Sequence, residues 1–195
     1  EALEQSLGEI LRRHDALRTT FRTIGGQPVQ AVSPARPLHL PVVDLSRLPA
    51  AVREAEALRL AAEETSRPFH LAHGPLFRAT LLKLDADAHV LLLTVHHIVS
   101  DGWSTGVLLR ELDTLYLAYA SGRPSPLAAL PIQYADFAVW QRERLQGDTL
   151  DQQLSYWKHQ LEGMPQVLEL PTDRPRPAAP TFRGATVAAT IPEEL

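Results

Sequence analysis

The sequence predicts an α/β fold in which helices alternate with pairs of short strands. Near the N-terminus, apolar side chains recur at helical spacing over residues 2–15. Gly25 and Gly26 then separate two short extended runs, which is a signal for a tight hairpin. The most apolar run of the chain, residues 90–95, is followed by an amphipathic helical pattern over 107–120. Helices interleaved with strand pairs in this way are typical of an α/β sandwich.

The same signals place the other elements. Helices are predicted over residues 2–15, 49–65, 107–120, 134–145 and 149–162, and strands over 17–24, 27–32, 38–44, 77–84, 90–95 and 187–191. Asp136 is expected to cap its helix, and Asp101 or Ser104 to cap the helix of 107–120. Trp140 and Trp157 are expected to pack in the core, because large aromatic rings dominate core packing.

Composition indicates an ordinary globular protein. The 195 residues are 45% hydrophobic and 22% charged, and the formal net charge is −4. The absence of Cys excludes a disulfide scaffold and a Cys nucleophile. Charges of both signs are mixed, so no nucleic-acid partner is expected. No apolar run reaches membrane-spanning length and no signal peptide is visible, so we expect a cytoplasmic protein with no membrane partner.

The two ends of the chain suggest a piece of a longer protein. The sequence does not begin with Met, and Glu1 already lies within a helical pattern. The last four residues resemble the start of another helix. We therefore expect sequence before and after these 195 residues.

A histidine pair follows the most apolar strand. Because side chains on a strand alternate between faces, His96 and His97 are expected to point in opposite directions, one into packing and one toward a cavity. Opposed faces argue against a shared metal ion, and no metal site is expected. Asp101 follows past the turn and could orient an imidazole or hold a distant cation. The alternative is that the pair only packs and Asp101-Gly102 only turns the chain.

Five stretches together resemble the condensation domains of nonribosomal peptide synthetases. The central one, His96-His97-Ile98-Val99-Ser100-Asp101-Gly102, is similar to the His-His-x-x-x-Asp-Gly motif, and Trp103-Ser104 extends the match. This motif alone also occurs in chloramphenicol acetyltransferase and its superfamily. The others resemble further motifs of the family, with Asp15 and His70 departing from its Glu and Asp: residues 13–21, 68–78, 134–140, and 156–158 with 170–177.

The resemblance implies a fold. It is a chloramphenicol acetyltransferase-like α/β sandwich in which two lobes form a V with the active site in a tunnel between them. Residues 1–177 would be most of the N-terminal lobe, with its start missing. Residues 178–195 would begin the crossover into the C-terminal lobe.

The resemblance also implies an activity, peptide-bond formation between a donor aminoacyl or peptidyl thioester and an acceptor aminoacyl thioester. Upstream and downstream peptidyl carrier proteins would present both on phosphopantetheine arms, with no cofactor bound directly, and an adenylation domain would lie next in the parent chain. His97 would be the catalytic residue, as a general base or as a positioning group, and His96, Asp101, Gly102, Trp103 and Ser104 would support it. Arg18 would form a structural ion pair with Asp101, and the Ser100 and Trp103-Ser104 pattern resembles the subtype that joins two L-amino acids.

Two other functions stay open. One is an acyltransferase of the same superfamily that uses acyl-coenzyme A and would share His97 and Asp101. The other is a silent domain that only docks carrier proteins, although such relatives usually lose the histidine motif. We also expect the isolated 195 residues to be inactive, because a tunnel between two lobes needs both.

Overall fold

The computed structural model describes residues 1–175, 177–179 and 187–191. Its contacts divide the chain into two units, Glu1–Gln146 and Gly147–Leu195. The first unit contains the predicted α/β core and all of the candidate site residues. The second contains the helix α5 (Gly147–Gln160).

A three-stranded sheet lies at the centre of the first unit. Its order is β3 (Val42–Asp44), β4 (Phe77–Lys83) and β5 (His89–Val95), with β3 parallel to β4 and β4 antiparallel to β5. Short strands rich in Val and Leu suit this position because both faces of the sheet are covered. The strands predicted over 77–84 and 90–95 are thus confirmed to within one residue.

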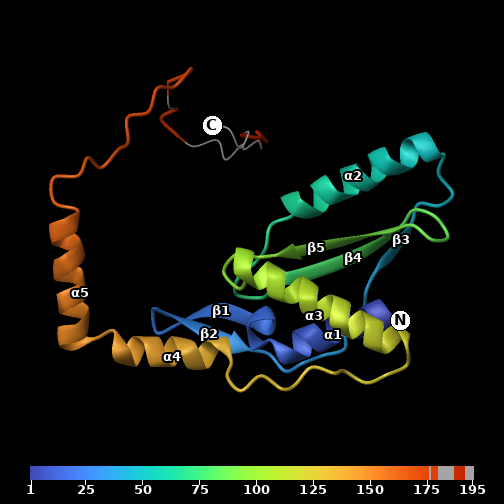
Figure 1. Ribbon diagram of the computed structural model, residues 1–195, viewed down its shortest axis with the longest axis horizontal. Helices are drawn as coiled ribbons and strands as arrows, with labels where there is room; N and C mark the ends of the chain where they lie inside the picture. The colour runs from blue at the N-terminus through green and yellow to red at the C-terminus, as the bar shows by residue number, and fades with distance from the viewer. Residues whose placement is uncertain (176, 180–186, 192–195) are drawn as a thin grey trace. The chain divides into compact units, whose positions relative to one another are not determined.

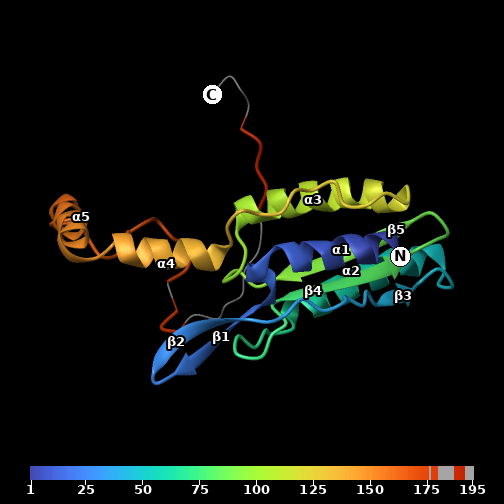
Figure 2. The ribbon, with the colours of Figure 1, turned by 90° about the horizontal axis from the view of Figure 1, so that it is seen from below.

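One face of the sheet is covered by two helices, α1 (Ala2–Arg13) and α3 (Gly102–Ala120), which lie side by side (Figures 1 and 2). Alternate strand residues point to this face, as the two-residue period of a strand requires. The core that they form contains these fully or nearly fully buried side chains: Leu7, Ile10, Leu17, Leu40, Phe77 and Leu115. Packing on this face therefore fixes how the N-terminal end of α3 meets the end of β5.

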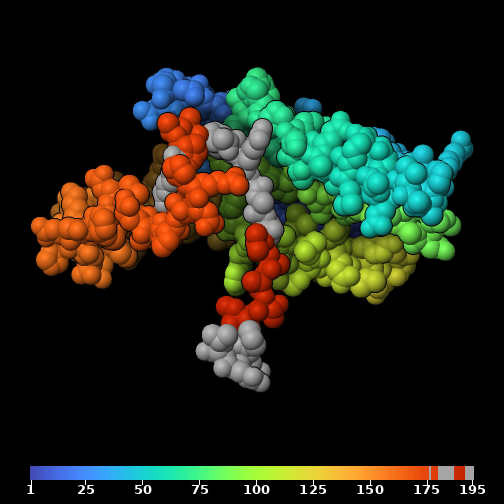
Figure 3. Space-filling view, turned by 90° about the horizontal axis from the view of Figure 1, so that it is seen from above, coloured from blue at the N-terminus to red at the C-terminus, as the bar shows by residue number. Residues whose placement is uncertain are grey.

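The other face is covered by α2 (Ala50–Ser66). Leu82 and Leu45 are buried against Ala57 of this helix. The outer side of α2 is solvated and carries the ion pairs of Arg59 with Glu56 and Glu63, and Figure 3 shows this helix, in cyan and green, along one face of the molecule. The unit is thus a helix–sheet–helix sandwich, as predicted.

A hairpin extends from α1 through the 3-10 turn η1 (Asp15–Arg18). Its strands are β1 (Thr19–Ile24) and β2 (Gln27–Val32), paired antiparallel. Gly25 and Gly26 form the turn with φ of 58° and 79°, which glycine adopts without a steric penalty. The glycine pair therefore places the hairpin turn where the sequence predicts it.

The helix α4 (Tyr134–Arg144) completes the first unit. The Asp136 carboxylate accepts a hydrogen bond from the Gln133 amide at 2.8 Å, so the predicted capping role of Asp136 is confirmed. The prediction of a core Trp140 is wrong, because its side chain is 55% exposed and lies against Phe137 on the helix surface. Trp157 of α5 is likewise 57% exposed. The prediction that these two tryptophans are buried rests on residue type alone. Neither α4 nor α5 has a buried residue.

Two further predictions concern the end of the chain. Residues 187–191 form no strand, so the strand predicted there is wrong. The predicted crossover of 178–195 falls largely on 180–186 and 192–195, outside the described residues, and stays a prediction. Among the described residues, no helix combines the length and apolar character needed to cross a membrane.

Candidate active site

The histidine motif occupies a tight turn between β5 and α3. The strand ends at Val95, and the His96 amide then donates to the Leu76 carbonyl at 2.9 Å. The Val99 amide donates back to the His96 carbonyl at 3.0 Å. These bonds tie the turn to the rigid sheet, which is how scaffolds position reactive loops.

His96 faces packing. Its Nδ1 accepts a hydrogen bond from the Ile98 amide at 3.0 Å, and its ring lies edge-on to Phe69 with 5.6 Å between centroids. The Arg78 guanidinium covers the Phe69 ring at 3.7 Å. His96 thus shapes the turn and packs against Phe69.

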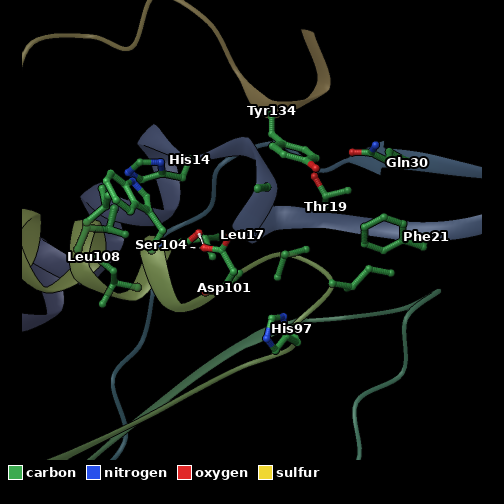
Figure 4. A pocket seen from close by; sticks show the side chains of 17 residues that line it. His14, Leu17, Thr19, Phe21, Gln30, His97, Asp101, Ser104, Leu108 and Tyr134 are labelled. Carbon is green, nitrogen blue, oxygen red and sulfur yellow. Dashed lines mark hydrogen bonds between the residues drawn. The ribbon is translucent and has the colours of Figure 1, made fainter. Parts of the chain in front are cut away.

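His97 faces a cavity of about 370 Å³, shown in Figure 4. The side chain is exposed, unlike that of His96. The division of the pair between packing and a cavity agrees with the prediction from strand alternation, although the strand ends just before His96. A neutral imidazole placed in this way can accept a proton or a hydrogen bond from a molecule in the cavity.

Asp101 begins the helix α3. Its carboxylate accepts hydrogen bonds from the Ser104 amide at 2.8 Å and the Ser104 hydroxyl at 2.6 Å, so Asp101 is the N-cap. The Ser104 hydroxyl, the Ser104 amide and, to a smaller extent, the charge that His97 can carry hold the pKa of Asp101 below its usual value. Asp101 is therefore an ionised carboxylate close enough to His97 for their charges to interact.

The helix starts five residues earlier than its apolar pattern predicts. Gly102 and Trp103 lie in the first turn of α3. Nothing lies within 4 Å of the position a Cβ would take at Gly102, and the Trp103 side chain is 82% exposed at the edge of the cavity. Both residues are thus open to a bound molecule.

The predicted ion pair of Arg18 with Asp101 is wrong. Arg18 pairs with Asp15 and donates to the carbonyls of Leu11, at 3.2 Å, and Ser33. Its position at the end of η1 turns the side chain back along α1 and away from the cap of α3. Asp101 binds Ser104 instead.

The buried ion pair of this region joins Arg13 to Glu111. Both contacts of the Arg13 guanidinium with the Glu111 carboxylate are 3.2 Å, and the side chains are 5% and 14% exposed. Arg13 also donates to the Ala128 carbonyl at 2.7 Å. The pair locks α1 to α3 under the cavity. A feature of the sequence could have indicated this pair. Glu111 falls inside the apolar stripe of 107–120, and a buried acidic side chain needs a partner of opposite charge.

His14 shares the same carboxylate, with 2.8 Å between its Nε2 and Glu111 Oε2. Burial raises the pKa of Glu111, but the hydrogen bonds from Arg13 and His14 outweigh burial and leave this pKa below its usual value. His14 also lines the cavity, which the sequence reasoning missed.

The cavity is mostly apolar with a few polar groups at its wall. Its apolar lining includes Ile10, Leu17 and Leu108, and the hairpin closes one side (Figure 4). A small organic group fits in such a volume, with imidazoles as its polar contacts. Among the described residues, no three potential metal ligands gather closely enough to hold a metal ion.

Comparison with known proteins identifies similar chains. A family model, that of the condensation domain, matches residues 1–195. One linear gramicidin synthase polypeptide from Brevibacillus parabrevis is 50% identical over 194 residues, and phosphinothricin tripeptide synthetase PhsC from Streptomyces viridochromogenes is 47% identical over 195. Each match covers 100% of this chain, which spans only 2% and 18% of these relatives.

Solved structures give the same grouping. The X-domain from teicoplanin biosynthesis is 36% identical with a TM-score of 0.79, and the match covers 93% of this chain and 40% of that one. The epimerization domain from the third module of tyrocidine synthetase B is 26% identical with a TM-score of 0.74, covering 88% and 39%.

Proposed function

The chain belongs to the condensation-domain family of nonribosomal peptide synthetases, and from this premise we propose that it takes part in forming a peptide bond between two carrier-bound amino acids. The general function of the family is peptide-bond formation, and the fold is the chloramphenicol acetyltransferase-like α/β sandwich that the resemblance implies. The chain corresponds to the N-terminal lobe of that fold.

The proposed reaction is aminolysis of a thioester. The α-amine of the acceptor attacks the carbonyl carbon of the donor, a C–N bond forms, and the C–S bond to the donor phosphopantetheine breaks. The amine loses one proton and the departing thiolate gains one. The two substrates would be presented by peptidyl carrier proteins upstream and downstream, with an adenylation domain supplying the aminoacyl groups in the cytoplasm.

One observation carries the proposal: the exposed imidazole of His97 lies in an apolar cavity beside the ionised Asp101, on a rigid turn. In this place His97 can contact the attacking amine. Two roles fit, removal of the amine proton as a general base and alignment of the amine for attack. Proton transfer typically contributes about 10²–10⁴-fold, and alignment can contribute as much.

The subtype that joins two L-amino acids is the finer proposal. It is supported by Ser100 before Asp101 and by Trp103-Ser104 after it, which resemble that subtype. The structure gives these residues a common location at the start of α3, at the edge of the cavity. A donor with L configuration should therefore react faster than its D enantiomer.

The experiment uses the intact protein that carries this chain, with its two flanking carrier proteins loaded chemically with donor and acceptor aminoacyl groups. Intact mass measurement follows the transfer of the donor to the acceptor carrier, with L and D donors compared. Dipeptidyl thioester on the downstream carrier supports the proposal. Acyl transfer from coenzyme A in place of the loaded carrier would refute it in favour of an acyltransferase. No transfer with either donor would leave docking as the function.

A further inference from the structure

The stretch of residues 68–78, which resembles a motif of the family, has no direct part in the proposed reaction. It forms the loop between α2 and β4 and the first residues of β4. Near its end, the Leu76 carbonyl accepts a hydrogen bond from the His96 amide at 2.9 Å. The partly buried ring of Phe69 meets the His96 ring edge-on, with 5.6 Å between centroids and 86° between the planes. The stretch therefore contacts His96 both through its backbone and through an aromatic ring.

The guanidinium of Arg78 holds the Phe69 ring in place. It lies 3.7 Å from the ring centroid, where its charge is attracted to the face of the ring. Every nitrogen of this guanidinium also donates to a residue that precedes Phe69 in the chain. The acceptors are the Glu64 carboxylate and the carbonyls of Glu64 at 3.1 Å, Arg67 at 2.8 Å and Pro68 at 3.3 Å. Because the Arg78 side chain is only 9% exposed and fully hydrogen-bonded, it is a rigid support for the ring.

His96 in turn holds the backbone around His97. The His96 Nδ1 accepts from the Ile98 amide at 3.0 Å, and the His96 carbonyl accepts from the Val99 amide at 3.0 Å. Both bonds close over His97, so together they hold the bend from which its side chain leaves the backbone. The first bond requires the His96 ring to keep its orientation, because a hydrogen bond weakens steeply away from its preferred angle.

We propose that Phe69 and Arg78 are positioning residues for His97. Arg78 holds the Phe69 ring, this ring holds the imidazole of His96, and His96 holds the bend that directs His97 into the cavity. The inference rests on the proposed function and adds to it two residues that act through others. Such positioning affects the rate strongly, because a displacement of about 1 Å at a reactive group can slow a reaction about hundredfold.

Two substitutions each remove one link. Phe69→Leu keeps an apolar side chain but removes the ring face that the guanidinium covers and the ring edge that meets the imidazole. Arg78→Lys keeps the charge but removes the planar fork of donors, which an ammonium group does not reproduce. Arg53→Lys is the matched control. Arg53 also donates to two backbone carbonyls and to a carboxylate, that of Asp85, but at the opposite end of the sheet, where β4 turns into β5.

The first readout is hydrogen–deuterium exchange of the intact protein, which needs no substrate. Mass spectrometry compares peptides that span residues 96–101 with peptides from α1. We expect Phe69→Leu and Arg78→Lys each to accelerate exchange at 96–101 about two- to tenfold, the effect of losing an aromatic contact that supports the bond of the Ile98 amide. Exchange in α1 should not change, and Arg53→Lys should match the wild type at 96–101. Unchanged exchange at 96–101 in Phe69→Leu would overturn the proposal. Equal acceleration at 96–101 and in α1 would show a general loss of stability and would overturn it as well.

The second readout is single-turnover dipeptide formation by the intact protein with loaded carrier proteins. We expect Phe69→Leu and Arg78→Lys each to slow this step about tenfold, with Arg53→Lys at the wild-type rate. Because both residues act through one ring, the double variant should be about as slow as the slower single variant, not about a hundredfold slower than wild type. A wild-type rate in Phe69→Leu, or effects that multiply in the double variant, would overturn the proposal. Absence of dipeptide from the wild type would instead refute the proposed function, and the exchange readout would still decide whether Phe69 and Arg78 hold the turn.

Discussion

The ion pair beneath the cavity leads to the sharpest test of the structure. Replacing Glu111 with Ala removes both contacts of the Arg13 guanidinium with a carboxylate and the contact of His14. Arg13, whose side chain is 5% exposed in the structure, would then keep only the Ala128 carbonyl as a partner among the described residues. Breaking a buried pair in this way costs roughly 3–5 kcal/mol of unfolding free energy.

Arg18 provides the contrast. Its side chain is 21% exposed, and its ion pair with Asp15 spans three residues at the surface. Such a pair contributes about 0–1 kcal/mol, to which the hydrogen bonds to two carbonyls add roughly 1–2 kcal/mol. Arg18→Ala should therefore destabilise the protein clearly less than Glu111→Ala.

Urea unfolding of the complete condensation domain measures both changes, with circular dichroism as the signal. Glu63→Ala is the matched control, because Glu63 also pairs with an arginine but is 67% exposed, and it should change the unfolding free energy by less than about 1 kcal/mol. A cost below about 1 kcal/mol for Glu111→Ala, or a larger cost for Arg18→Ala, would contradict the assignment of the buried pair.

Three further outcomes follow from the packing and the charges. Leu115 is fully buried, so Leu115→Ala should lower the unfolding free energy by about 2–5 kcal/mol in the same assay, and a change below about 1 kcal/mol would contradict its core position. The folded-state pKa of Glu111 is lowered, so the ionised carboxylate stabilises the fold. This stabilisation is complete above the unfolded-state pKa near 4.5 and is lost as the pH falls through the folded-state pKa. The loss of stability on acidification below about pH 4.5 should then be smaller in Glu111→Gln than in wild type, and equal losses would argue against this role. Asp101→Ala removes the cap of α3, so amide exchange at Ser104 and Thr105 should accelerate while exchange at Leu115 is unchanged; unchanged exchange at Ser104 would contradict the cap.

Hydrophobic periodicity predicts most elements of this fold. Helices cover both faces of the sheet, so each covering helix needs an apolar side that shows in the sequence. The helix of 2–15 is observed as Ala2–Arg13, and the hairpin strand of 27–32 has the predicted bounds. The start of α3 was missed by its apolar pattern because the first turn, with its exposed Trp103, carries no apolar stripe. There the cap, not the periodicity, sets the helix boundary.

The candidate site is only partly predictable for a related reason. Strand alternation separates His96 from His97, since that rule is local. The partner of an arginine depends on the direction of its long side chain, which strand and helix patterns do not give: Arg18 turns back to Asp15, and Arg13 reaches the buried Glu111. The His14 ring at the cavity wall is held by Glu111, which lies 97 positions away in the sequence, and no local rule predicts this contact.

The central claim is that His97 acts on the attacking amine, and single-turnover dipeptide formation tests it most directly. The intact protein is mixed with preloaded donor and acceptor carriers, and the dipeptidyl thioester is quantified over time for wild type, His97→Ala and the control His89→Gln. The account predicts that His97→Ala slows the step at least tenfold, and by about 10²–10⁴-fold if His97 is the general base, with the control at the wild-type rate. Dipeptide formation by a folded His97→Ala at the wild-type rate would contradict it.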